Sequence, residues 1–527
     1  MAIHPLPETI ADLMAMDLAA LPPEEALQAA SILIDLGDDA GDAAALDRAA
    51  GVLDYLQARG GLPPGIDCRI HYCRANIWSA RRRITGETQS WVWKSDLIDA
   101  ELLELRRTVA HAAFPELPPI ARAQALTNLG NVLNHIGRFV EAIEAWDRAL
   151  AGVPNFGMAN GNRGLGLIHY ASGLYDPGHR GVLVLAARHA LERTTDPDVL
   201  WESPGLEPAQ AHFAQRAAEI DAHFDVPAMS AGFDLNGHSL GRGRRERDYR
   251  RWCLNNRLFL NPLNDVGPYA IAANDVMTLP SLTVRFEDGP SPPPVIHYFN
   301  VLKQEYASAR YALFEGLTSE GVHFSDREVL LYDTLDFPAF GHGVERLKTA
   351  FRNAYSLLDK TGFLLNAYLG LGHGERQVSF RNLWFETPKA RALHPKFDGA
   401  ANWPLRGLFW LAKDIYEDTF RKVTEPDAQA LYELRNHLEH KFVGVHDDQL
   451  MAASICPLPS PPLGVFDITA TDLAAKTLRQ LKLARAALTY LAMGVFAEER
   501  RREAESGGGL TMPMSLFTWK DAWKRRD

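Results

Sequence analysis

The sequence predicts an all-α protein built from an N-terminal helical solenoid and a C-terminal helical bundle. Residues 8–225 are rich in Ala and Leu, show little clustering of β-branched residues, and read as one helix after another. From residue 295, five longer stretches place apolar residues at the 3.6-residue spacing of an amphipathic helix. The 527 residues are 46% hydrophobic and 23% charged, which is an ordinary globular composition and argues against a fibrous or wholly disordered chain.

The clearest unit of the first part covers residues 125–156, ALTNLGNVLNHIGRFVEAIEAWDRALAGVPNF. Small side chains at Gly130 and Ala142 let two antiparallel helices approach closely. Gly137 supplies the turn between them, and Pro154 ends the second helix. This spacing resembles the 34-residue tetratricopeptide (TPR) repeat.

Neighbouring segments carry weaker versions of the same pattern. Gly164 stands 34 residues after Gly130, and three upstream stretches also look like paired helices, at 40–58, 66–84 and 95–114. One such unit cannot bury its own apolar face, so degenerate neighbours are expected. We therefore expect residues 1–225 to form a TPR-like helical domain that binds a peptide or protein ligand.

Residues 226–294 change character and are predicted to be an irregular connector, basic at first and then rich in Asn and Pro. Gly, Pro and Asn recur too often for long helices, and the closing GPSPPP is typical of a stiff linker or a helix start. Residues 295–505 are predicted to be the bundle, followed by a Gly-hinged basic and aromatic tail at 506–527. The expected bundle helices are 295–317, 343–371, 404–420, 427–443 and 472–503.

Charge and cysteine content restrict the function classes. With 55 Lys+Arg and 66 Asp+Glu the net charge is −11, which argues against nonspecific coating of nucleic acid but allows a local basic cleft. The four cysteines do not form paired metal-ligand motifs, so no metal or other cofactor is expected. No apolar run approaches the ~18–20 residues that cross a bilayer, and the opening residues lack a basic region, so we expect a cytoplasmic protein without a membrane partner.

The most informative segment is LYELRNHLEHKF at 431–442. On a helical wheel, Arg435, Asn436 and His440 share one polar arc, while His437 points away from it. The arc lies beside a stripe that is expected to be buried, formed by Leu431, Leu434, Leu438 and Phe442. A second protomer docking against the arc would create a cleft with two Arg and two His.

Such a cleft suits metal-free RNA cleavage. Arg435 can hold the scissile phosphate, and His440 can move the proton of the 2′-OH or of the leaving 5′-oxygen, while Asn436 orients either group. Because the 2′-OH is the nucleophile, the substrate is restricted to RNA. The alternative is a solvated helix end, with Arg435 paired to Glu439 and His440 capping the helix.

An RNxxxH motif on the fourth long helix of a C-terminal bundle resembles the HEPN superfamily (higher eukaryotes and prokaryotes nucleotide-binding). The order of TPR-like helices, then RRWCLNNRLFLNPLND, then the bundle resembles its TPR-fused prokaryotic branch, over roughly residues 245–500. The resemblance implies a metal-independent endoribonuclease of toxin–antitoxin or antiphage systems, acting as a homodimer whose motifs meet at the interface. When the family motif is transferred to this sequence, it falls on Arg435, Asn436 and His440. His437 provides a second imidazole within the same motif.

Three functions follow from these observations. The first is this endoribonuclease, regulated through the TPR-like domain. The second is a non-catalytic scaffold, because other superfamily members only bind or dimerise. The third is a nucleotide-binding sensor, which ranks last because the chain has no nucleotide-binding motif.

The connector offers a candidate RNA-binding set. Four arginines beside Tyr249 and Trp252 can hold an RNA backbone while the rings stack on bases. Such a run is more often a solvated face or an interdomain contact. The four residues are Arg244, Arg245, Arg250 and Arg251.

Overall fold

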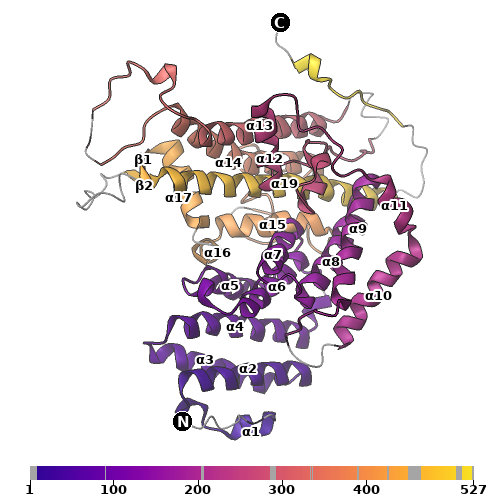
Figure 1. The fold of residues 1–527 in the computed structure, drawn as a ribbon, viewed down its shortest axis with the longest axis vertical. Helices are drawn as coiled ribbons and strands as arrows, with labels where there is room; N and C mark the ends of the chain where they lie inside the picture. The colour runs from indigo at the N-terminus through magenta and orange to yellow at the C-terminus, as the bar shows by residue number, and fades with distance from the viewer. Residues whose placement is uncertain are drawn as a thin grey trace.

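The computed structural model describes residues 7, 9–89, 91–202, 207–284, 292–332, 334, 336–387, 391–423, 427–448, 464–505 and 513–524. Over these residues the chain is a stack of helices with one two-stranded sheet, which confirms the predicted all-α class (Figure 1).

The N-terminal half consists of antiparallel helix pairs stacked on one another. Within each pair the helices follow one another in the sequence: α2 with α3, α4 with α5, α6 with α7, and α8 with α9 (Figure 1). The bounds are α1 Ile10–Ala15, α2 Pro23–Ala40, α3 Ala43–Arg59, α4 Pro64–Ile84, α5 Asp96–Ala110, α6 Pro119–His135, α7 Phe139–Gly152, α8 Gly157–Ser172, α9 Pro177–Glu192 and α10 Glu207–His223.

Small residues set the close packing around α7, as the sequence predicts. The ring of Trp146 lies so near Gly130 of α6 that a Cβ there would stand 2.5 Å from Nε1, and a Cβ on Gly166 of α8 would collide with the same ring. Gly137 adopts φ +88° in the turn between α6 and α7, a conformation that favours glycine. These glycines therefore fix the spacing of three consecutive helices.

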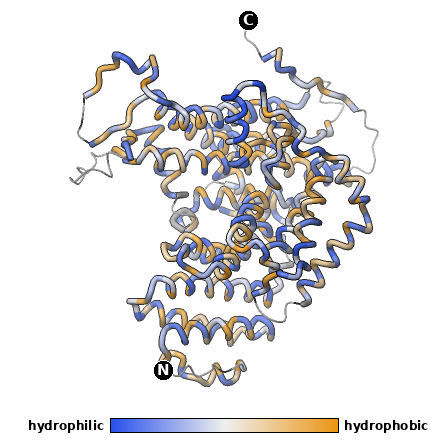
Figure 2. Tube along the Cα trace, in the orientation of Figure 1, coloured by the Kyte–Doolittle hydropathy of each residue, from blue (hydrophilic) through white to orange (hydrophobic). Residues whose placement is uncertain are grey.

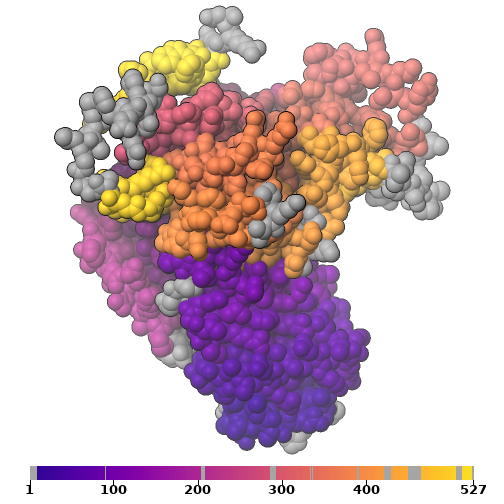
Figure 3. Space-filling model, turned by 180° about the vertical axis from the view of Figure 1, so that it is seen from behind, coloured from indigo at the N-terminus to yellow at the C-terminus, as the bar shows by residue number. Residues whose placement is uncertain are grey.

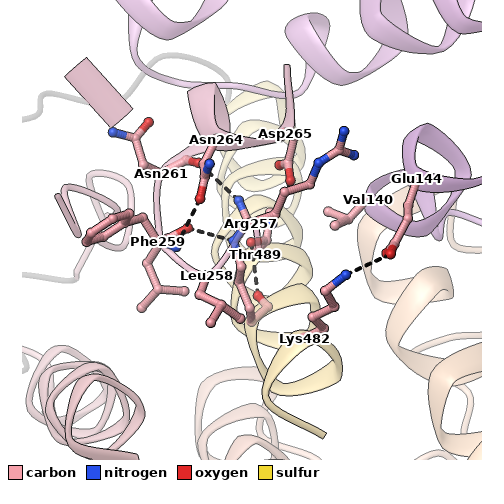
Figure 4. Close-up of polar contacts among 12 residues, drawn as sticks. Val140, Glu144, Arg257, Leu258, Phe259, Asn261, Asn264, Asp265, Lys482 and Thr489 are labelled. Atoms are coloured by element: carbon pink, nitrogen blue, oxygen red, sulfur yellow. Dashed lines mark hydrogen bonds and ion pairs between the residues drawn. The ribbon is translucent and has the colours of Figure 1, made fainter. Parts of the chain in front are cut away.

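Residues 226–284 pack against both halves of the molecule. They contain α11 Val226–Gly232, α12 Arg244–Asn255 and a short 3-10 turn at Pro262–Asp265. The Asp265 carboxylate is buried. It accepts a hydrogen bond from the hydroxyl of Tyr170 in α8 (2.9 Å) and pairs with Arg485 of α19 (2.6 Å). Figure 4 shows this turn beside α19, with the Lys482–Glu144 ion pair linking α19 to α7.

The C-terminal half is a helical bundle. It contains two long helices and a third, shorter helix that is almost fully buried. Its bounds are α13 Pro294–Leu317, α14 His342–Leu369, α15 Trp403–Tyr416, α16 Asp418–Val423, α17 Asp427–His440, β1 Phe442–His446, β2 Val465–Thr469 and α19 Ala470–Glu505. β1 and β2 run parallel, with Phe442 opposite Val465 and His446 opposite Thr469.

Two expected helices differ from the structure. The helix expected at 404–420 is divided, because Glu417 adopts extended backbone (ψ 129°) between α15 and α16. The helix expected at 427–443 ends at His440, because the chain enters β1 at Phe442 and pairs with β2. The apolar pattern alone does not distinguish a short strand of aromatic and β-branched residues from a continuation of the preceding helix.

Helix α15 joins the two halves. Every residue from Pro404 to Tyr416 is buried, and one hydrophobic cluster runs from α5–α9 through α15 into α13, α14 and α19. The Trp403 indole donates to the Asn134 carbonyl at the end of α6 (2.7 Å). Asp414 pairs with Arg106 of α5 and with Arg138 at the start of α7. The solenoid-like half is therefore fixed directly to the bundle (Figure 3).

Candidate functional site

Helix α17 is held in the bundle by one apolar face. Leu431, Leu434 and Leu438 are buried, and the helix packs against α14, α15 and α19. The fourth member of the expected stripe, Phe442, is 74% exposed, so that expectation is wrong. The residue lies in β1, where successive side chains alternate between faces and the helical spacing no longer applies.

Arg435 and Asn436 contact each other on the neighbouring face of α17. The Arg435 Nη1–H donates to the Asn436 Oδ1 (3.1 Å), and both side chains are half-buried. The guanidinium carbon lies 5.7 Å from the ring centroid of Tyr355 in α14, within cation–π range. Within the described chain no ion pair joins Arg435 to Glu439, so this arginine is oriented by Asn436 and an aromatic ring.

The surroundings of the Arg435 guanidinium are buried and polar. Burial raises the pKa of the Asp359 carboxyl in α14, while the Phe380 N–H bond and the positive charge of Arg435 act in the opposite direction. Burial also raises the pKa of the Tyr355 hydroxyl to about 12, so it stays protonated at neutral pH. Tyr355 and Asp359 are spaced i, i+4 on α14, so both side chains lie on the face of that helix near Arg435.

The two histidines of the motif have different environments. The His437 Nδ1–H donates to the Glu433 carbonyl (2.8 Å), and its ring centroid lies 5.4 Å from that of Phe466 in β2. His440 is exposed at the last position of α17, and no polar partner for it is found among the described residues. His437 is therefore engaged within the fold, while the His440 imidazole is accessible.

A buried histidine that the sequence analysis did not single out lies six residues beyond His440. The Nδ1–H of His446 in β1 donates to the Asp336 carbonyl (2.7 Å), and Nε2 lies 3.1 Å from the Asp467 carboxylate of β2. Because acceptor oxygens lie close to both ring nitrogens, the protonated form of the ring is favoured. The Asp467 and Asp336 contacts outweigh burial and raise the pKa of His446.

The four connector arginines lie on α12, near the C-terminal segment. Arg244 and Arg245 have side chains that are 93% and 66% exposed, and Arg251 is also exposed. Arg250 instead donates to the Ala273 carbonyl (2.7 Å) and pairs with Glu246. In the tail, the hydrogen bond and the charge of Lys524 lower the pKa of Asp521, with a smaller contribution from the charge of Arg250, and Trp519 and Trp523 are exposed.

Neither a metal-binding cluster nor a membrane-spanning helix is found among the residues that the structure describes. They contain no group of three or more His, Cys, Asp or Glu side chains that could hold a metal ion. They also contain no helix that is long and apolar enough to cross a membrane.

Residues 286–498 match the family model of the LA2681-like HEPN domain. The match covers α13 to α17, both strands and most of α19, and it includes the Arg435–Asn436–His440 motif. It supports the HEPN superfamily for this part of the chain. No family match supports the TPR-like repeats, which stay a prediction. No curated protein and no solved structure matches the chain.

Proposed function

We propose that the protein is a metal-independent HEPN endoribonuclease. The observation that carries this proposal is the arrangement on α17 inside the HEPN-matching bundle: Arg435 is oriented by Asn436, and His440 is exposed at the end of the same helix. In the proposed reaction, His440 accepts the proton of an RNA 2′-OH, and the 2′-oxygen attacks the adjacent phosphorus. The bond between the phosphorus and the 5′-oxygen breaks, and the protonated His440 returns its proton to that oxygen, so the histidine ends the step in its starting state.

Arg435 has the electrostatic role in this proposal. Its guanidinium binds the non-bridging phosphate oxygens and stabilises the charge that builds up as the phosphorus becomes five-coordinate. The products carry a 2′,3′-cyclic phosphate on one fragment and a free 5′-OH on the other. The active form is a homodimer through the bundle, and the N-terminal half regulates it by binding a partner, as in a toxin or antiphage effector.

The test is cleavage of single-stranded RNA by the purified full-length protein in EDTA, with end-group analysis of the fragments. We expect 2′,3′-cyclic phosphate ends, and a rate that falls about 10²–10⁴-fold in Arg435→Ala and His440→Ala. The matched control is His189→Ala, an exposed histidine on α9 that should leave the rate unchanged. Cleavage by the Arg435→Ala/His440→Ala double variant at the parent rate contradicts the site.

A non-catalytic scaffold is the second candidate, and one observation favours it. Arg435 is already occupied by Asn436 and the Tyr355 ring, as a structural arginine would be. A scaffold predicts no RNA cleavage with or without a partner bound, and partner capture that survives both substitutions. The cleavage assay therefore separates the two candidates.

A further inference from the structure

Arg406 of α15 is a buried arginine that has no carboxylate partner among the described residues. Its side chain belongs to a residue that is only 1% exposed. A buried guanidinium normally needs an anionic partner, because the protein interior solvates a lone charge poorly. The other buried arginines of the described chain each pair with an Asp or Glu: Arg82, Arg106, Arg138, Arg310 and Arg485.

The unpartnered N–H groups of Arg406 form one edge of its guanidinium. The Nη1–H donates to the His135 carbonyl at the end of α6 (3.1 Å), whereas Nε and Nη2 are buried without a hydrogen-bond partner in the described chain. In this protein, Arg83 uses the same edge for the Asp38 carboxylate, with Nε donating to one oxygen and Nη2 to the other. The edge of Arg406 therefore fits two oxygens of one acceptor group.

Two further nitrogens without a partner in the described chain belong to nearby side chains, Nε of Arg82 on α4 and Nε2 of His135 on α6. Burial and the charge of Arg82 lower the pKa of Arg406 to about 10, and the charge of Glu87 opposes them. Burial and the charges of Arg406 and Arg82 lower the pKa of His135 to about 3. The His135 ring is therefore neutral at neutral pH, and its Nε2 can carry a hydrogen and donate it.

The acidic side chains in this part of the core have other partners. Glu101 pairs with Arg82, and Asp414 pairs with two other arginines. The charge of Glu87 acts on Arg406, but the described chain shows no ion pair between them. Residues 404–416 of α15 are all buried, and Figure 2 shows mostly hydrophobic residues along this helix, so bulk solvent does not neutralise the charge. A small anion that enters from solution is the acceptor that remains.

We propose that Arg406, Arg82 and His135 form a binding site for a phosphate ion. The tetrahedral oxygens of phosphate can accept from the Arg406 edge and from the two further donors at once, which a carboxylate or a chloride ion cannot do. Because the donor nitrogens of Arg406 are buried, the ligand is a free ion rather than the phosphate group of a larger molecule.

This site lies where the N-terminal half meets the bundle. α4 and α6 belong to the first, and α15 lies between them and the long helices of the second (Figure 1). A bound phosphate connects side chains of all three helices, so it stabilises the contact between the halves by mass action. The site is distinct from the candidate cleavage site on α17 and does not depend on RNA cleavage.

The test is isothermal titration calorimetry of the full-length protein with inorganic phosphate at constant ionic strength. We expect one phosphate per chain. In Arg406→Met the dissociation constant should rise on the order of 100-fold, because two charge-assisted hydrogen bonds are lost while an unbranched apolar stem is kept. Two controls should bind phosphate as the parent does. They are Arg59→Met, an exposed arginine at the end of α3, and Arg435→Ala, which removes the phosphate contact of the candidate cleavage site.

Hydrogen exchange of the parent locates the site even if Arg406→Met fails to fold. Saturating phosphate should slow amide exchange in the first turn of α15 and the last turn of α6. No saturable binding by the parent, equal affinities of the parent and Arg406→Met, or protection elsewhere in the chain overturns the proposal. Loss of binding in Arg435→Ala alone overturns it as well, because the ion then occupies the α17 site. Equally tight binding of acetate or chloride overturns the assignment to phosphate.

Discussion

At the scale of single residues, two histidines on α17 have opposite roles. His437 donates to a backbone carbonyl of its own helix and packs on Phe466, so it connects α17 to β2. His440 makes no such contact within the described chain. The sequence motif favours His440 by spacing alone, and the contacts of His437 give an independent reason for the same choice.

We expect His437→Ala and His440→Ala to differ in kind. His437→Ala should lower the free energy of unfolding by about 1 kcal/mol, because it removes one hydrogen bond and one ring contact. His440→Ala should leave the free energy of unfolding within about 0.5 kcal/mol of the parent, as surface substitutions do, and lower the rate of RNA cleavage about 10²–10⁴-fold. Urea unfolding and RNA cleavage rates of both variants check this prediction. If His437→Ala were as stable as the parent but lost RNA cleavage, His437 rather than His440 would be the catalytic histidine.

At the scale of elements, the small sheet determines where α17 ends. β1 starts two residues after His440, pairs with β2 on one edge and bonds to residues 337–339 on the other. His446 joins all three, through the Asp336 carbonyl and the Asp467 carboxylate. The strand that follows the exposed end of α17 is thus anchored by one buried histidine.

The stability of this junction should depend on pH. Since the pKa of His446 is raised in the folded protein, its contribution is fully present below the unfolded pKa of about 6.5 and is lost as pH rises through the folded value. The melting-temperature difference between the parent and His446→Gln should therefore be largest below pH 6.5 and should shrink at higher pH. A difference that is constant with pH would show that His446 is neutral in the fold.

The elements also show how far sequence patterns reach. The bundle helices at 295–317 and 343–371 lie within two residues of α13 and α14, because their apolar stripes are long and Pro294 and Gly370 mark a start and an end. The sheet was missed because five-residue strands are too short for periodicity to identify them, and their pairing joins residues about twenty positions apart.

At the scale of the whole molecule, charge is distributed unevenly. The net charge is −11, yet α12 carries five arginines against two acids, a local 5 − 2 = +3. Arg244 and Arg245 extend into solvent, whereas Arg250 is bonded to the Ala273 carbonyl. We propose that α12 supplies local phosphate contacts on an otherwise acidic protein.

RNA binding should report these contacts through its dependence on salt. We expect Arg244→Gln/Arg245→Gln to weaken binding and to lower the slope of log K against log salt by about 0.7 for each lost contact with single-stranded RNA. Arg59→Gln, an exposed arginine at the end of α3, is the matched control and should change neither quantity. Fluorescence anisotropy with a labelled RNA measures the slope, and equal slopes in the parent and both variants would exclude α12.

The sequence by itself determined the helical class, the close approach of α6 and α7 at Gly130, and the motif on α17. The helical class and the motif depend on residue spacing within about one or two helical turns, and the close approach depends on a single glycine. Only the tertiary structure decided what surrounds that motif. The Tyr355 ring over Arg435, the His446 junction and the buried α15 between the halves each join residues that are distant in sequence. Such contacts form where separate helices pack together, and local periodicity carries no information about which faces meet.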